Sequence, residues 1–230
     1  AIVGFSSILD ETDEEQEKRE YISIIENNNA LLLQLIGDIL DLSKIEAGTL
    51  EFNFSDFELN ELMHEKENII RMKTAEGVEL IFEPGLDACL FHSDRNRLSQ
   101  LLINLLTNAG KFTSEGSITL GVEICSEQNE VLFSVTDTGP GIPLDKQEMV
   151  FNRFEKLDGN KKKGTGLGLA ICRQIAMIFG GRIWVDPTYT GGARFIFAHP
   201  IGIRLPEDRE HREGGGFEPS GDVKDPPCSR

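Results

Sequence analysis

Three polar side chains share a helical spacing in the sequence NLLTNAGKF, residues 104–112. Asn104 and Asn108 are one helical turn apart and Lys111 follows a turn later, so all three lie on one helix face opposite a run of leucines. A carboxamide oxygen suits Mg²⁺, which takes few protein ligands and completes its shell with water and phosphate oxygens. An ammonium group neutralises phosphate charge. Taken alone, the pattern fits a metal–phosphate site or a solvated helix surface.

A second pattern, DTGPGIP at residues 137–143, directly follows the strand-like sequence EVLFSVT. Glycine and proline clusters are typical of ordinary turns. An acidic residue at a strand end, beside glycines that allow close approach of a ligand, also suits a hydrogen bond from the exocyclic amine of adenine. Asp137 is therefore a candidate base-binding residue.

The third pattern is the glycine-rich sequence GTGLGL at 164–169, which leads into an apolar, helix-like segment. Its G-x-G-x-G spacing matches neither the Walker phosphate loop nor the Rossmann dinucleotide turn. Glycines at the start of a helix still present backbone N–H groups to an anion. The preceding basic sequence KLDGNKKK is either a solvated charge run or a neighbour of that anion.

These patterns must be positioned by interleaved helices and strands. Two hairpins, at 117–137 and 182–200, imply mostly antiparallel pairing, which favours an α+β sandwich over a doubly wound parallel sheet. Asp94 is well placed to cap a helix N-terminus. We expect helices at 58–76, 94–112, 144–154 and 166–181, and strands at 49–59, 78–82, 88–92, 117–125, 130–137, 182–186 and 192–200.

A long helix is expected ahead of this region, from Gln16 to about Ala47. Its apolar stripe is as broad as a bundle-core face. About 32 residues of helix span roughly 48 Å, whereas the nine residues before the acidic linker span only about 14 Å. Most of the stripe therefore lacks a partner within the chain. We expect a truncated hairpin that dimerises into a four-helix bundle. The stripe comprises Ile22, Ile25, Leu32, Leu33, Ile36, Ile39 and Leu40, with Asn29 as a surface or register-setting residue.

Composition narrows the function classes. The net charge of −16 argues against a nucleic-acid partner. The four cysteines show no C-x-x-C spacing, which argues against zinc. No apolar run approaches the roughly 20 residues that span a bilayer. We expect a soluble, cytoplasmic chain without membrane contact, whose parent protein can still carry an inner-membrane anchor.

In this order, NLLTNAGKF, DTGPGIP, FNRFEKLD and GTGLGLAIC resemble the N, G1, F and G2 boxes of sensor histidine kinases. The upstream sequence DILDLSKIEAG resembles the end of the second helix of their dimerisation and histidine-phosphotransfer domain. The resemblance implies an α+β architecture: a helical hairpin, then a two-layer α/β sandwich of the Bergerat ATP-binding type with a mobile lid. It divides the chain into a partial hairpin at 1–48, a catalytic domain at 49–200 and a disordered or non-native tail at 201–230.

The resemblance also implies roles for single residues. Asn108 would coordinate Mg²⁺, Asn104 would orient the reaction or act as a base, and Lys111 would contact phosphate. Asp137 would accept a hydrogen bond from the adenine amine. Phe151 and Phe154 would anchor one end of the lid, and Phe154 would also belong to the ATP site. The other residues implied at the ATP site are Phe112, Gly139, Gly141, Ile142, Lys156, Gly164, Thr165, Gly166, Leu167 and Gly168.

The implied reaction passes the γ-phosphoryl group of ATP to a histidine and then to an aspartate of a response-regulator receiver domain. Ala193 departs from the Ser or Thr of many relatives. The family's H box, of the form H-E-L-R-T-P-L, would directly precede Ala1, and the chain's four histidines lie elsewhere. We therefore expect this chain to bind ATP and Mg²⁺ without phosphorylating itself. A gyrase-like or chaperone-like clamp ATPase and a non-enzymatic nucleotide-binding scaffold are the alternatives.

Overall fold

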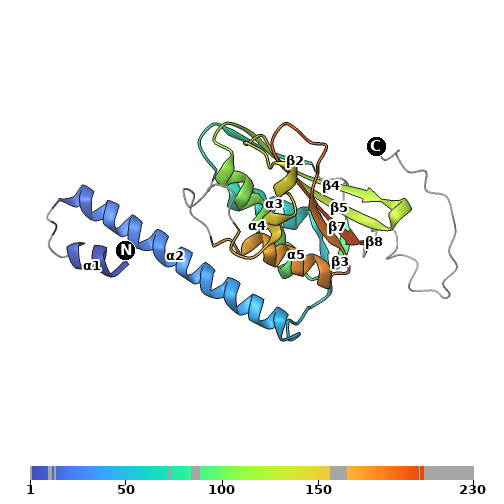
Figure 1. Ribbon diagram of the computed structural model, residues 1–230, viewed down its shortest axis with the longest axis horizontal. Coiled ribbons are helices and arrows are strands. Elements are labelled where there is room, and N and C mark those ends of the chain that lie inside the picture. Colours follow the sequence, from blue (N-terminus) through green and yellow to red (C-terminus); the bar gives the residue numbers. More distant parts are fainter. Residues whose placement is uncertain are drawn as a thin grey trace.

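The computed structural model contains a helical segment followed by a mixed α and β domain (Figure 1). It describes residues 2–9, 12, 14–71, 74–83, 89–155, 165–201 and 203–204.

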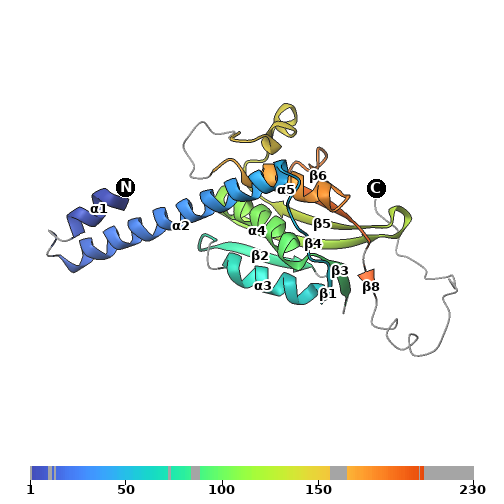
Figure 2. The same cartoon turned by 90° about the horizontal axis from the view of Figure 1, so that it is seen from below.

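The helical segment consists of α1 (Ile2–Leu9) and α2 (Glu15–Glu46). The short helix α1 folds back on the first part of α2, where the Phe5 and Tyr21 rings lie 5.4 Å apart (Figures 1 and 2). Helix α2 ends at Glu46, and Gly48 follows with a φ of +66°, which few other residues adopt. No helix within the described part of the chain is long and apolar enough to cross a membrane.

The larger sheet of the domain has five strands in the order β2-β4-β5-β7-β6. Strand β2 pairs with β4 in parallel, and the other neighbours pair antiparallel. This arrangement confirms the expected α+β sandwich and its two hairpins. The strand bounds are β2 (Val78–Glu83), β4 (Gly116–Cys125), β5 (Glu130–Asp137), β6 (Arg182–Val185) and β7 (Arg194–Pro200).

A smaller antiparallel sheet joins β1 (Ser55–Glu58), β3 (Leu90–Ser93) and β8 (Ile203–Arg204). Strand β8 corrects the prediction that the whole segment after residue 200 is a tail; residues 205–230 lie outside the described ones. The predicted strand at 49–59 is limited to β1. In its first half Phe52 packs on Phe179, with ring centroids 5.1 Å apart, and the Asn53 N–H donates to the Asp94 carboxylate at 2.7 Å instead of to a neighbouring strand.

Three helices cover one face of the five-stranded sheet: α3 (Leu59–Arg71), α4 (Arg95–Phe112) and α5 (Gly168–Ile178) (Figure 2). Helix α4 begins where predicted, because the Asp94 carboxylate accepts hydrogen bonds from the N–H groups of Asn96 and Arg97. The short helix predicted at 144–154 is instead two 3₁₀ turns, Leu144–Lys146 and Met149–Phe151.

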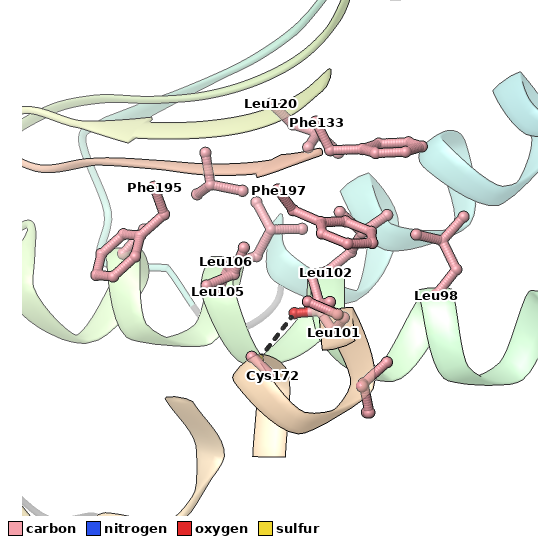
Figure 3. Packing of buried hydrophobic residues seen from close by; sticks show 14 of the residues in the cluster. Leu98, Leu101, Leu102, Leu105, Leu106, Leu120, Phe133, Cys172, Phe195 and Phe197 are labelled. Carbon is pink, nitrogen blue, oxygen red and sulfur yellow. Dashed lines mark hydrogen bonds between the residues drawn. The ribbon is translucent and has the colours of Figure 1, made fainter. Parts of the chain in front are cut away.

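The core lies between these helices and the sheet. Leu101, Leu102 and Leu105 of α4 are fully buried and point towards the sheet, where Phe133 and Phe197 contribute rings (Figure 3). Burying such side chains contributes about 1.5–3 kcal/mol each. The leucine face of α4 is therefore fixed in the core, and its polar face must point away from it.

Candidate active site

The polar face of α4 is held against the start of α5. The Asn104 carboxamide donates to the carbonyl oxygen of Gly168 at 3.4 Å. The neighbouring Cys172 is fully buried, and its thiol donates to the Leu101 carbonyl at 3.7 Å (Figure 3). Burial raises the pKa of the Cys172 thiol to about 12, so the thiol stays protonated. Asn104 therefore joins two helices, a contact that positions the first turn of α5.

Asn108 lies one turn further along the same face and is half-buried. Its carboxamide makes no hydrogen bond with any residue that the structure describes, so its oxygen is available to a hard cation. Lys111 follows, with its Nζ 4.8 Å from the centroid of the Phe112 ring. This donor set fits a Mg²⁺ ion that takes most of its ligands from phosphate and water.

Asp137 ends strand β5 with its side chain almost completely buried. The backbone N–H groups of Gly139 and Ala193 donate to its Oδ1 at 2.8 and 3.3 Å. Burial raises the pKa of the Asp137 carboxyl, while the two backbone hydrogen bonds act in the opposite direction. Oδ1 accepts both of these hydrogen bonds. The geometry therefore suits acceptance of a further hydrogen bond at Oδ2.

Two glycines near Asp137 are required by protein packing. A Cβ on Gly139 would lie 2.9 Å from the carbonyl oxygen of Phe112, at the end of α4. Gly141, with φ +72°, would place a Cβ 2.8 Å from the carbonyl oxygen of Gly192. These contacts join the 137–143 turn to α4 and to the β6–β7 hairpin. Ile142 of the same turn packs partly buried against the core.

A backbone hydrogen bond joins the two described flanks of the predicted lid sequence. The Phe154 N–H donates to the carbonyl oxygen of Gly166 at 2.8 Å, and the Phe151 ring is buried. Phe154 itself has φ +63° and leaves 67% of its surface exposed. The chain is thus joined to residue 166 through the Phe154 backbone, while the Phe154 side chain points outward; a lid anchored at Phe154 stays a prediction. Lys156 and Gly164, also predicted at the site, lie outside the described residues.

The start of α5 makes a contact that the sequence did not predict. The Leu167 N–H donates to Thr165 Oγ1 at 3.1 Å, and the Thr165 hydroxyl donates to Asp38 Oδ2 at 3.0 Å. Asp38 belongs to α2 and is only 6% exposed. Burial, with the negative charge of Asp41 nearby, raises the pKa of the Asp38 carboxyl, while the Thr165 hydrogen bond opposes that shift. No local signal marks Asp38, since a charged residue in a long helix is typically solvated.

Other polar contacts hold the end of α2 against the domain. Asp41 binds Arg97 at 3.1 Å and Gln100 at 2.7 Å, both on α4. Glu46 pairs with Arg153. Helix α2 consequently runs beside α5 in both views (Figures 1 and 2).

Two families match this chain. Residues 93–203 match the family described as histidine kinase-, DNA gyrase B-, and HSP90-like ATPase. Residues 1–48 match the His Kinase A (phospho-acceptor) domain.

Curated relatives are similar along most of the chain. The circadian input-output histidine kinase CikA of Synechococcus elongatus is 39% identical over 186 residues, which cover 78% of this chain. Hybrid signal transduction histidine kinase B of Dictyostelium discoideum is 34% identical over 217 residues, or 88% of this chain. The matched part spans 24% of the first relative and 11% of the second.

Solved structures are similar as well. Full-length ShkA in complex with AMPPNP has a TM-score of 0.72 and 29% identity, covering 87% of this chain and 42% of ShkA. The catalytic domain of histidine kinase ThkA has a TM-score of 0.56 and 35% identity, covering 65% of this chain and 96% of that domain. ThkA in complex with the response regulator protein TrrA has a TM-score of 0.65 and 32% identity, covering 90% of this chain and 58% of the matched chain.

Proposed function

This chain belongs to the sensor histidine kinase family, and on that premise we propose that it binds Mg-ATP and presents the γ-phosphoryl group to a histidine. One observation carries the proposal. On the polar face of α4, Asn104 donates a hydrogen bond to Gly168. At the C-terminal end of α4, the carbonyl oxygen of Phe112 lies against Gly139. A single helix thus spans from the expected phosphate site to the expected base site.

Each residue of this site contacts a different part of Mg-ATP. Asp137 accepts a hydrogen bond from the adenine amine, and Asn108 supplies a carboxamide oxygen to Mg²⁺. The first turn of α5 offers backbone N–H groups to the phosphates, and Lys111 adds positive charge. Phosphoryl transfer depends on positioning and charge stabilisation more than on covalent chemistry, so these contacts suffice for the catalytic domain's part.

The partners follow from the same family. We infer that the chain forms a homodimer through the exposed apolar face of α2. We also infer that the phosphohistidine formed by the whole protein passes its phosphoryl group to a response-regulator receiver domain. The match to the His Kinase A domain supports the first inference. The ThkA complex with a response regulator supports the second.

Nucleotide binding is tested by the melting temperature of the chain with ATP, with and without Mg²⁺. Ligand at 100 times its Kd stabilises the folded state by about 2.7 kcal/mol. Asn108→Ala should lose most of the Mg²⁺-dependent rise in melting temperature. Asn27→Ala, on an exposed part of α2, should show the same rise as the wild type. An unchanged melting temperature for the wild type with Mg-ATP would refute the proposal. With γ-labelled ATP, we expect no acid-labile label on the 230-residue chain.

A further inference from the structure

The hydrogen bonds at the start of α5 form a relay to a carboxylate. The Leu167 N–H is satisfied by Thr165 Oγ1, and the Thr165 hydroxyl is satisfied by Asp38 Oδ2. The first N–H groups of a helix have no partner within the helix and attract anions. Asp38 therefore supplies, through one hydroxyl group, negative charge to the helix end that is proposed to hold phosphate.

Asp38 differs from the other acidic residues that hold α2 against the domain. Asp41 and Glu46 each pair with an arginine, Arg97 and Arg153 respectively. Within the described part of the chain, no lysine, arginine or histidine pairs with Asp38. Its charge is thus less compensated than theirs, and burial limits its screening by solvent. A triphosphate brought to the start of α5 would be repelled by this carboxylate.

We propose that Asp38 and Thr165 form a latch, in which a carboxylate of α2 competes with the phosphates of ATP for the N-terminus of α5. The latch rests on the proposed function, since it presumes that phosphate binds there. In the latched state α2 lies against the domain and the Thr165 hydroxyl is directed to Asp38. Binding of the triphosphate at this helix end favours release of that hydrogen bond.

The latch couples two parts of the molecule. If triphosphate weakens the Asp38–Thr165 contact, the docking of α2 must weaken triphosphate binding by the same factor, because coupling between two binding events is reciprocal. A displacement of α2 that separates Asp38 from Thr165 would then raise the affinity for ATP. Asp38 is a positioning residue in this scheme, since it acts on the nucleotide through Thr165 and the end of α5.

The test compares Mg-ATP and adenosine affinities of the 230-residue chain by calorimetry and NMR titration. Asp38→Asn keeps the shape of the side chain and removes its charge. Glu26→Gln removes the same charge from an exposed position of α2 and is the matched control. We expect Asp38→Asn to raise Mg-ATP affinity about 5- to 20-fold, Glu26→Gln to change it less than about 2-fold, and adenosine affinity to stay constant. In a Thr165→Val background the gain from Asp38→Asn should disappear.

Each other outcome overturns the latch. An unchanged or lower Mg-ATP affinity in Asp38→Asn excludes competition. An equal gain in Glu26→Gln would show that the effect is one of net charge alone. A gain that persists in the Thr165→Val background would show that Thr165 does not transmit the effect. If the wild type binds Mg-ATP and the variants match it, only the latch fails. If the folded wild type does not bind Mg-ATP at all, the proposed function fails and the latch fails with it. Melting curves of every variant verify that it is folded.

Discussion

The backbone N–H of Phe154 donates to the carbonyl oxygen of Gly166 at 2.8 Å, so the two flanks of the predicted lid sequence are joined beside the proposed nucleotide site. Gly166 has φ +73°, and a Cβ at this position would lie 2.8 Å from Phe154 Cα. The contact is between backbones and cannot be relieved by a side-chain rotation. Phe154, with φ +63°, is held in a conformation that non-glycine residues seldom adopt.

We therefore expect Gly166→Ala to displace the lid flank from Phe154 and to lower Mg-ATP affinity at least about 10-fold, with a stability loss of about 1–3 kcal/mol from backbone strain. Isothermal calorimetry and thermal unfolding measure the two effects. Gly4→Ala, where an added Cβ meets no atom within 4 Å, is the control. Wild-type affinity in Gly166→Ala would show that this junction does not position the nucleotide.

Base recognition gives a second prediction, at Asp137. Its carboxylate can accept from the amine of adenine, whereas the carboxamide of Asp137→Asn can donate to the carbonyl of guanine. Because hydrogen bonds to charged groups contribute about 1.5–3 kcal/mol, ATP affinity should fall about 10- to 150-fold. Affinity for GTP should change much less, so the ratio of ATP to GTP affinity should fall. Competition titrations with both nucleotides measure that ratio. Equal losses for both would contradict a base-reading role.

Helix α4 shows how much of this site could be predicted from the sequence. Asp94 caps the helix and Leu101, Leu102 and Leu105 fill the core, so the position of Asn108 on the opposite face follows from local spacing alone. The spacing of the apolar residues and the capping residue are local properties of the sequence, and the folded domain retains both. The hairpin of β4 and β5 was predictable for the same reason.

The contacts of α2 with the domain could not be predicted in this way. Asp38 and Thr165 are far apart in sequence, and nothing in either neighbourhood marks the other. The alternation at residues 49–59 predicts a strand, yet Phe52 packs against Phe179, and the Asn53 N–H donates to Asp94 Oδ2 instead of to a neighbouring strand. Local periodicity cannot distinguish a strand from an extended linker whose alternate side chains are buried by tertiary packing.

The buried imidazole of His199 predicts a pH dependence of stability. Its ring lies 4.7 Å from that of Phe179, its Nδ1 lies 2.6 Å from the Pro200 carbonyl oxygen, and Nε2 lies 2.9 Å from Ser93 Oγ. Burial lowers the pKa of His199 below its usual value. The unfolded chain therefore binds this proton more readily. The contribution of His199 is fully present above about pH 6.5 and is lost as pH falls through the folded pKa.

Urea unfolding between pH 7.5 and 5 should show this loss, and His199→Gln should flatten the profile while keeping a polar partner for Ser93. The pKa shifts of Asp38 and Asp137 change the stability of the fold with pH in the opposite direction. Burial raises the pKa of each carboxyl, so its contribution is lost as pH rises through the folded pKa. Both carboxyls are present in wild type and variant, so the difference between the two profiles isolates His199. Parallel profiles would contradict the assignment.

The exposed apolar face of α2 predicts self-association. Leu33 is 71% exposed and Leu40 is 56% exposed, although both lie in the broad apolar stripe of the helix. Helix α1 covers only the first part of that stripe, so the remainder is available to a second copy. Burying one such side chain contributes about 1.5–3 kcal/mol. Leu40→Glu should therefore raise the dimer dissociation constant at least about 10-fold in sedimentation equilibrium. Leu144→Glu, at a leucine that is 71% exposed but lies outside α2, should leave the dissociation constant unchanged. A wild type that stays monomeric at high concentration, or a Leu40→Glu variant that dimerises normally, would exclude this face as the interface.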